Sequence, residues 1–156
     1  MIKLFIPGKG DAILDHVVFD VNGTLAVDGV LCEGVERRLS DLAGHLTIHM
    51  LTADTHGGQA AIDEQLGMTA VRMCHGNERE QKADYVARLG ADHVVAVGNG
   101  GNDVGMLHAA AIGIAVLGQE GLNVEALQAA DVVAGSPVDA LDLLLKPKRL
   151  IASLRR

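Results

Sequence analysis

Three apolar segments of the sequence are each followed by polar residues that could bind a phosphate group or a metal ion. Asp20 follows HVVF, Thr52 follows LTIHML, and the loop GNGGND at 98–103 follows VVAV. A carboxylate can act as a nucleophile or a metal ligand, a threonine can donate hydrogen bonds to a phosphate oxygen, and Asn and Asp oxygens suit Mg²⁺. Lys82 lies early in an expected helix, where a cation is disfavoured unless an anion faces it. These residue types are compatible with binding of a phosphate group and of a hard cation such as Mg²⁺.

The glycine-rich loop indicates a binding site more specifically than the turn after Asp20 does. Asn22, Gly23 and Thr24 could direct backbone N–H groups at an anion, but they are also ordinary turn residues. A threonine that closes a strand and a lysine on a helix also have ordinary structural explanations. The loop is more specific, because its glycines allow close backbone approach and its side chains offer oxygen ligands. It is not a dinucleotide-binding fingerprint, since Asp103 stands where that motif requires glycine.

Short β-type segments alternate with helical patterns, and these elements must position the polar residues. Strands are expected at 16–20, 46–51, 70–73, 93–98, 113–116 and 132–133, and helices at 35–45, 60–67, 78–90, after Asp103, 124–131 and 136–145. The alternation predicts a three-layer α/β fold, a Rossmann-like parallel sheet flanked by helices. The polar residues are expected to meet at the carboxyl ends of the strands. IKLFI and AILDHVV predict an N-terminal β-hairpin at an edge of this sheet.

Length and composition favour one domain at 1–156 with an aliphatic core. The chain has 156 residues, of which 49% are hydrophobic and 2% aromatic. The formal net charge of −7 argues against a nucleic-acid partner, because clustered cations bind phosphate backbones. The longest apolar stretch, AAAIGIAVLG, is about half the length that spans a bilayer. With no recognisable secretory signal and two cysteines expected to be reduced, we expect a cytoplasmic protein that binds no membrane.

Cations gather near the end of the sequence, at Lys146, Lys148, Arg149, Arg155 and Arg156. We interpret them as solvated residues of a last helix, whose negative carboxyl end they favour.

In order, the Asp, the Thr, the Lys and the Asn/Asp loop resemble the motifs of the haloacid dehalogenase-like (HAD) superfamily of phosphoryl-transfer proteins. The likeness is strongest to the phosphorylation domain of P-type ATPases. FDVNGTL resembles its Asp-Lys-Thr-Gly-Thr-Leu segment, LTAD at 51–54 its Leu-Thr-Gly-Asp, and GNGGNDVGML its Gly-Asp-Gly-x-Asn-Asp loop. The likeness continues through IGIAV and AADVV and so covers most of residues 17–134. The chain has no room for the membrane, nucleotide-binding and actuator domains of a pump, and it resembles the small proteins described as soluble P-type ATPase-like.

The resemblance implies a role for each matching residue. Asp20 would be the nucleophile that forms an aspartyl-phosphate, assisted by Thr52 and Lys82. The implied phosphate-binding residues are Asn22, Gly23, Thr24, Thr52, Ala53 and Lys82. The implied Mg²⁺ ligands are Asp20, the main-chain carbonyl of Asn22, Asn99 and Asp103, with Asn102 in a supporting position.

Two residues depart from the pattern of the superfamily. Most of its phosphatases carry a second Asp where Asn22 stands, and that acid protonates the leaving group and later activates water. Such acid–base help commonly contributes about 10²–10⁴ in rate, so hydrolysis should be slow. Asn99 stands where a metal-binding Asp is usual, so metal affinity should be weaker. With phosphate dianion, Mg²⁺ and Lys82 the site still carries a net charge of only about −1, so phosphate binding is not penalised.

The spacing of the motifs leaves no room for the cap domain that covers the site in many relatives. About 30 residues separate Asp20 from Thr52 and Thr52 from Lys82, and the expected helices and strands fill both intervals. Capless relatives act on large substrates or borrow a neighbouring subunit as a lid. We therefore expect a homo-oligomer.

We hypothesise a slow Mg²⁺-dependent phosphatase or phosphotransferase acting through Asp20 on a small phosphorylated substrate or a phosphoprotein. An alternative is a catalytically weak or inactive module that binds a phosphorylated ligand or a protein partner. The asparagines at positions 22 and 99 favour this alternative. A response-regulator-like phosphoacceptor ranks third, because its Asp normally ends a middle strand. A transition-metal site at His45 and His49 or at Cys74 and His75 is disfavoured by the spacing of these residues.

Overall fold

A six-stranded parallel sheet forms the centre of the protein. The structure, a computed structural model, describes residues 1–54 and 57–156. The strand order is β10-β9-β8-β3-β6-β7, and every neighbouring pair is parallel. The strands are β3 (His16–Asp20), β6 (Thr47–Thr52), β7 (Val71–Arg72), β8 (Val94–Gly98), β9 (Ile112–Val116) and β10 (Val132–Ala134). The Rossmann-like sheet predicted from the alternating segments is confirmed.

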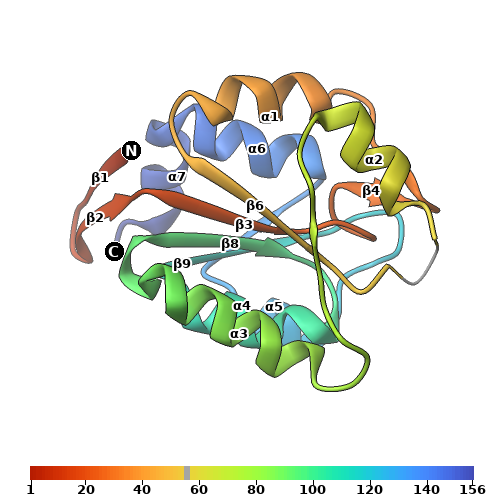
Figure 1. Ribbon diagram of the computed structural model, residues 1–156. Coiled ribbons are helices and arrows are strands. Elements are labelled where there is room, and N and C mark those ends of the chain that lie inside the picture. Colours follow the sequence, from red (N-terminus) through yellow and green to blue (C-terminus); the bar gives the residue numbers. More distant parts are fainter. Residues whose placement is uncertain (55–56) are drawn as a thin grey trace.

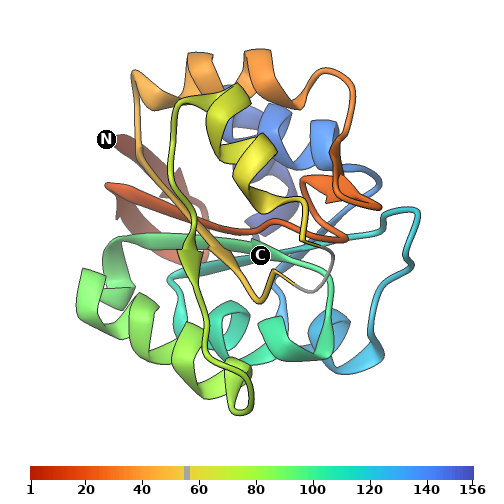
Figure 2. The ribbon, with the colours of Figure 1, turned by 45° about the vertical axis from the view of Figure 1, so that its right-hand side comes forward.

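Helices cover both faces of this sheet and complete three layers (Figures 1 and 2). One face carries α1 (Val35–Ala43), α2 (Gln59–Leu66) and α6 (Pro137–Leu145). The other carries α3 (Glu78–Leu89), α4 (Val104–Ala109) and α5 (Val124–Ala129). Two short 3-10 helices, η1 (Ala91–His93) and η2 (Gly101–Asp103), precede β8 and α4 respectively.

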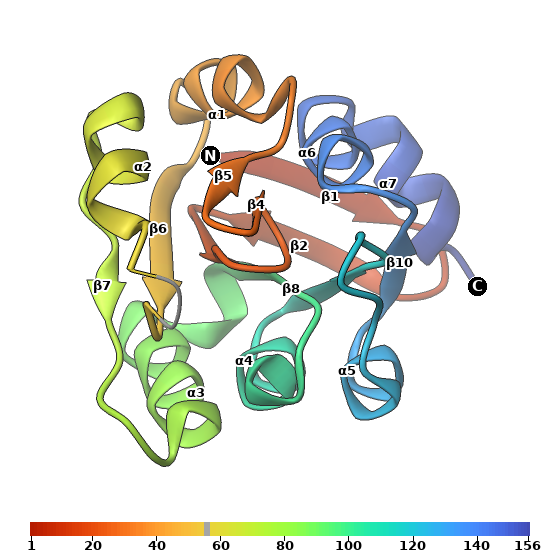
Figure 3. The same ribbon diagram turned by 90° about the vertical axis from the view of Figure 1, so that its right-hand side faces the viewer.

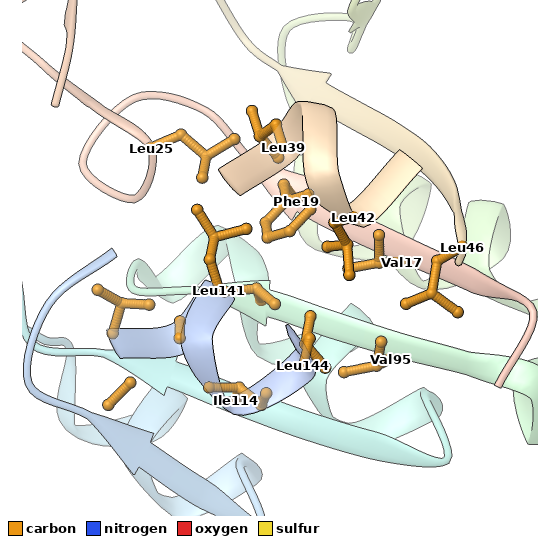
Figure 4. Packing of buried hydrophobic residues seen from close by; sticks show 14 of the residues in the cluster. Val17, Phe19, Leu25, Leu39, Leu42, Leu46, Val95, Ile114, Leu141 and Leu144 are labelled. Atoms are coloured by element: carbon orange, nitrogen blue, oxygen red, sulfur yellow. The ribbon is translucent and has the colours of Figure 1, made fainter. Parts of the chain in front are cut away.

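Alternate residues of the central strands enter separate hydrophobic clusters, which explains their continuous apolar runs. In β3, Val17 and Phe19 belong to the cluster that contains α1 and α6, and Val18 belongs to the cluster that contains α3 and α4. Figure 4 shows the first cluster, in which strand residues face the side chains Leu39, Leu42, Leu141 and Leu144. Burial of each such side chain contributes about 1.5–3 kcal/mol, so aliphatic packing holds the helices on the sheet.

The N-terminal hairpin is present but is not an edge of the central sheet. β1 (Ile2–Ile6) and β2 (Gly10–Leu14) pair antiparallel in a two-stranded sheet of their own. The predicted edge position was therefore wrong. One face of the hairpin packs into the core, where Leu4 and Leu14 are fully buried, while Phe5 and Ile13 on the other face are exposed.

The C-terminal cations do not complement the end of one last helix. Pro147 begins a new helix, α7 (Pro147–Leu154), because proline cannot continue the hydrogen bonding of α6. Lys146 lies at the end of α6 and donates to Asp142 (2.9 Å), as a helix-end cation should. Lys148 and Arg149 lie in the first turn of α7, so the interpretation was wrong for them.

A second hairpin was missed at the sequence level. β4 (Ala26–Val27) and β5 (Val30–Leu31) pair antiparallel, joined by Asp28 and Gly29 at φ 52° and 77°. Positive φ at both loop residues is the two-residue hairpin turn that Asp-Gly favours, so VDGV carried a readable signal. No cap domain is inserted, and within the described residues no helix is both long and apolar enough to cross a membrane.

Candidate active site

The predicted site residues lie at the point of the sheet where the order of the strands reverses. From β3 the chain builds β6 and β7 on one side, and β8, β9 and β10 on the other. Ligands bind at such a switch point, beyond the carboxyl ends of the strands. Asp20 ends β3, Thr52 ends the adjacent β6, and Asp103 lies in η2 directly after β8. Figure 3 looks onto this edge, with the β4–β5 hairpin in front of it.

A buried ammonium group joins two of these carboxylates. Nζ of Lys82 donates to Oδ1 of Asp20 (2.6 Å) and to Oδ1 of Asp103 (2.7 Å), and all three residues are buried. Lys82 and Val86, four residues apart, are the buried face of α3, which directs the lysine at the sheet. The trio has one cation for two carboxyl groups, so it carries one negative charge in excess when both are ionised.

This environment changes the acidity of the nucleophile candidate. Burial, and next the neighbouring Asp103, raise the pKa of Asp20 to about 7 despite the opposing effect of Lys82. Burial alone would lower the pKa of Lys82, but the two carboxylates raise it above its usual range. Lys82 is therefore held charged, and Asp20 needs a further cation to be fully ionised at neutral pH.

The loop after β8 wraps around the side chain of Asp103. Its Oδ2 accepts hydrogen bonds from the backbone N–H groups of Asn99 and Gly100, both at 2.9 Å. A Cβ on Gly98 would stand 2.6 Å from Cγ of Asp103, so only glycine permits this approach. Gly98 thus lets the backbone of the loop approach a carboxylate of the same loop.

The turn after Asp20 is tied to both neighbouring strands. The Thr24 hydroxyl lies 3.2 Å from Oδ2 of Asp20 and 3.1 Å from Oδ1 of Asn99, so it can donate to either oxygen. On the other side Nδ2 of Asn22 lies 3.5 Å from Oγ1 of Thr52. Oγ1 of Thr52 also accepts from the backbone of Asp54 (3.0 Å).

An open cleft of about 510 Å³ lies beside this turn. It is lined by Asn22, Asn99, Gly100, Asn102, Glu120, Gly121, Leu122 and Asn123. Asn102 thus lies at the cleft and not in the buried network, and Ala53 is half-buried next to Thr52. The remaining predicted residues are brought together by the fold.

Glu120 was missed in the sequence. It lies in the loop between β9 and α5, 17 residues after Asp103, and belongs to none of the motifs. Yet its Oε2 is 2.5 Å from the point where a Cβ would stand on Gly23, and Nδ2 of Asn99 is 2.9 Å from the same point. Gly23, at φ 83°, makes room for both groups.

The oxygen atoms at the site fit a hard divalent cation, but one of them belongs to a neutral amide, which binds such a cation more weakly than a carboxylate does. Asp20, Asp103 and Oδ1 of Asn99 are oxygen donors, and the excess negative charge of the buried trio favours a cation. Among the described residues, no three His, Cys, Asp or Glu side chains are grouped to hold a metal ion. His49 instead lies in hydrogen-bond range of His16 (3.2 Å) and of the Tyr85 hydroxyl (2.9 Å).

Comparison with known proteins found relatives by sequence. No protein-family model matches the chain. The uncharacterized protein MJ0073 of Methanocaldococcus jannaschii is 36% identical over 92 residues, which are 56% of this chain and 99% of that protein. The uncharacterized protein MJ0072 of the same organism is 46% identical over 39 residues, 25% of this chain and 89% of that protein.

Solved structures match the fold. A protein described as a HAD superfamily (subfamily III A) hydrolase from Legionella pneumophila has a TM-score of 0.70 at 19% identity, covering 90% of this chain and 87% of that one. The 3-deoxy-D-manno-octulosonate 8-phosphate phosphatase of Moraxella catarrhalis, in complex with magnesium, phosphate and KDO, has a TM-score of 0.63 at 16% identity, covering 91% and 94%.

A zinc-transporting PIB-type ATPase in its E2.Pi state has a TM-score of 0.63 at 28% identity, covering 80% of this chain but 20% of the ATPase. The likeness is thus to one part of that pump. With 36% identity over 99% of MJ0073, the chain belongs to the same family as that protein, and it has the fold of the HAD superfamily without a cap.

Proposed function

We propose that the protein is a Mg²⁺-dependent phosphatase or phosphotransferase in which Asp20 attacks the phosphorus atom and becomes an aspartyl-phosphate. The position of Asp20 carries this proposal. Its carboxylate ends the first strand of the sheet at the switch point, and receives hydrogen bonds from Lys82 at 2.6 Å and Thr24 at 3.2 Å. The HAD fold and the similarity to phosphatases and to part of a P-type ATPase support the same chemistry.

In the attack, an electron pair of the Asp20 carboxylate forms a bond to phosphorus. The bond from phosphorus to the leaving-group oxygen breaks, and that oxygen keeps its electron pair. Lys82 offsets charge on Asp20, while the Thr52 hydroxyl is suited to a phosphoryl oxygen. The backbone N–H groups of Gly23 and Thr24 instead donate to the carbonyls of Ala26 (2.7 Å) and Val21 (3.2 Å), contrary to the expectation that this turn directs them at an anion. Asp20, Asp103, Asn99 and the carbonyl of Asn22 would hold Mg²⁺, which when bound offsets charge on the phosphoryl group and favours ionised Asp20.

Proton transfer limits this chemistry. An amide at position 22 can neither protonate an alkoxide leaving group nor take a proton from water. Substrates whose leaving group needs no proton, such as acyl phosphates, should therefore phosphorylate Asp20 faster than alkyl phosphates do. Hydrolysis of the aspartyl-phosphate should be slow.

We propose in addition that a second copy of the chain covers the open site. Val30, the first residue of β5, is 68% exposed, and Leu117, which lines a second cleft beside Gly23 and Thr24, is 53% exposed. Both are apolar groups that a subunit contact would remove from water. Light scattering after gel filtration tests this: a strict monomer at all concentrations contradicts it.

A second candidate function is a binding module for a phosphorylated ligand. Asn22 and Asn99 favour it, because both positions lack an acid that turnover usually requires. Such a module would still need Asp103 and Lys82 for structure and would bind phosphate and Mg²⁺ without transfer.

One experiment separates the two functions. The protein is incubated with Mg²⁺ and either acetyl phosphate or p-nitrophenyl phosphate, phosphate release is followed, and any acyl-phosphate is trapped for mass spectrometry. The enzyme predicts an adduct on Asp20 that Asp20→Asn abolishes. Binding of phosphate without adduct or turnover from either donor contradicts the enzyme and supports the module.

A further inference from the structure

The cleft beside Asp20 is lined by one carboxylate side chain. Of its eight lining residues, four are asparagines, two are glycines and one is a leucine, and the eighth is Glu120. Asp20 and Asp103 are buried beneath and do not line the cleft. Water that enters the cleft therefore meets the Glu120 carboxylate beside the amides of Asn22 and Asn99.

The loop that carries Glu120 is anchored to Asn99 at two points. The side-chain Nδ2 of Asn99 donates to the carbonyl of Gly121 (3.3 Å), and its carbonyl accepts from the backbone N–H of Asn123 (2.9 Å). A turn closes between Gly118 and Gly121 (3.0 Å), with Glu120 inside it. These bonds fix the backbone on either side of Glu120, an exposed residue whose Oε2 is 2.5 Å from the position of a missing Cβ on Gly23.

An Asp at position 99 would not support this arrangement. A carboxylate has no N–H to donate to the Gly121 carbonyl, and its charge would repel Glu120, because both side chains approach the same point above Gly23. The neutral amide at 99 and the carboxylate at 120 are thus compatible with each other. The departure at Asn99 has a structural reason, namely that it positions an acid elsewhere.

We propose that Glu120 is the general base for hydrolysis of the aspartyl-phosphate, in place of the acid absent at position 22. A water molecule in the cleft attacks phosphorus while its proton passes to the Glu120 carboxylate. The bond from phosphorus to the Asp20 oxygen breaks, and its electron pair returns to Asp20. Inorganic phosphate leaves, and Glu120 releases its proton to solvent. This inference rests on the proposed function, because it requires the aspartyl-phosphate.

The test compares two steps in the whole protein. The aspartyl-phosphate adduct is formed with acetyl phosphate and Mg²⁺. The leaving group of this step is acetate, which needs no proton. Acetyl phosphate is then removed, and the loss of the adduct is followed over time. In Glu120→Gln we expect formation within about threefold of the wild type and loss slowed by about 10²-fold. Mn²⁺ affinity, measured by electron paramagnetic resonance, should be unchanged.

Two further variants make the result specific. Glu33→Gln is the matched control, because Glu33 is an exposed carboxylate that lines the other cleft beside Gly23, and it should change neither step. Asn22→Asp placed in Glu120→Gln should restore the loss of the adduct, since it returns an acid to the cleft. Circular dichroism establishes that each variant is folded.

Each other result overturns the inference in a distinguishable way. Loss of the adduct at the wild-type rate in Glu120→Gln overturns it and leaves the proposed function standing. Equal slowing of both steps with weaker Mn²⁺ binding also overturns it, because Glu120 would then act through the metal. An absence of adduct in both the wild type and Glu120→Gln, with no phosphate release from either, removes the proposed function and this inference with it.

Discussion

Nζ of Lys82 donates a 2.6 Å hydrogen bond to Oδ1 of Asp20 across 62 residues of sequence. The bond lies in the buried interior, and the same ammonium also reaches Asp103 at 2.7 Å. The ammonium thus ties α3 to the end of β3 and to the loop that follows β8. It also leaves one carboxylate of the trio without its own cation, and this charge imbalance is the property that a divalent cation would correct.

Removal of Lys82 should therefore destabilise the fold strongly. Lys82→Met leaves two carboxyl groups buried without a cation, and loss of one partner of a buried ion pair costs about 3–5 kcal/mol. Urea denaturation at neutral pH measures the change. Lys148→Met, at an exposed lysine of α7, is the control and should stay within about 0.5 kcal/mol of the wild type. Equal effects of the two variants would contradict the structural role of Lys82.

Stability should fall with rising pH through Asp20 when no metal is present. The pKa of this carboxyl is about 7 in the folded protein against 3.8 for an ordinary aspartate. Between these values the folded state binds more protons, so raising the pH favours unfolding. Asp20→Asn cannot ionise and should become more stable than the wild type by an amount on the order of a few kcal/mol at pH 8, and not at pH 4. Parallel pH profiles for the two proteins, measured in EDTA, would refute this.

Mg²⁺ should stabilise the wild type more than it stabilises Asp20→Asn. A ligand that binds only the folded state stabilises it by about 2.7 kcal/mol at one hundred times its dissociation constant. Thermal unfolding should therefore shift upward with Mg²⁺ in the wild type and hardly at all in Asp20→Asn, because Asp20 is a proposed ligand. EDTA should abolish the shift. An equal shift in both proteins would place the cation elsewhere.

Gly98 should not tolerate a side chain. Gly98→Ala places its Cβ 2.6 Å from the Asp103 carboxyl carbon and should cost about 1–3 kcal/mol, because the loop or the carboxylate must move. Gly44→Ala is the matched control, since Gly44 has helical backbone (φ −71°) and an added Cβ would meet nothing closer than 3.5 Å. Chemical denaturation compares them. A neutral Gly98→Ala would show that the approach is not tight.

Asn22→Asp should raise the rate of hydrolysis. The new carboxyl would stand next to the phosphate-binding turn and supply acid–base help commonly worth about 10²–10⁴ in rate. Glu120 already supplies part of this help on our account, so a gain of about tenfold in phosphate release from p-nitrophenyl phosphate is expected. The control is Asn22→Asp combined with Asp20→Asn, which should be inactive. An unchanged rate would mean that proton transfer at position 22 does not limit turnover.

The placement of the main site residues could be predicted because it follows from regular structure. Apolar strands that end in Asp20, Thr52 and the Gly98–Asp103 loop must bring these residues to one edge of a parallel sheet. Lys82 could be predicted as a site residue because its position near a helix start is unfavourable without a facing anion. The structure gives it two, Asp20 and Asp103.

The features that were missed depend on contacts between distant loops. Glu120 lies over Gly23 only because Asn99 holds the intervening turn, and no local pattern in GQEG indicates this. The independence of the β1–β2 sheet likewise depends on its packing with the core. The β4–β5 turn was different: Asp28 and Gly29 gave a local signal that was overlooked.

The most direct test of the account is the identity of the phosphorylated residue. After brief reaction with acetyl phosphate and Mg²⁺ and rapid acid quenching, peptide mass spectrometry should locate one phosphoryl group, on Asp20, in the wild type and in Glu120→Gln. The adduct should persist longer in Glu120→Gln. A phosphoryl group on another residue, or none in either protein, would contradict the assignment of Asp20 as the nucleophile.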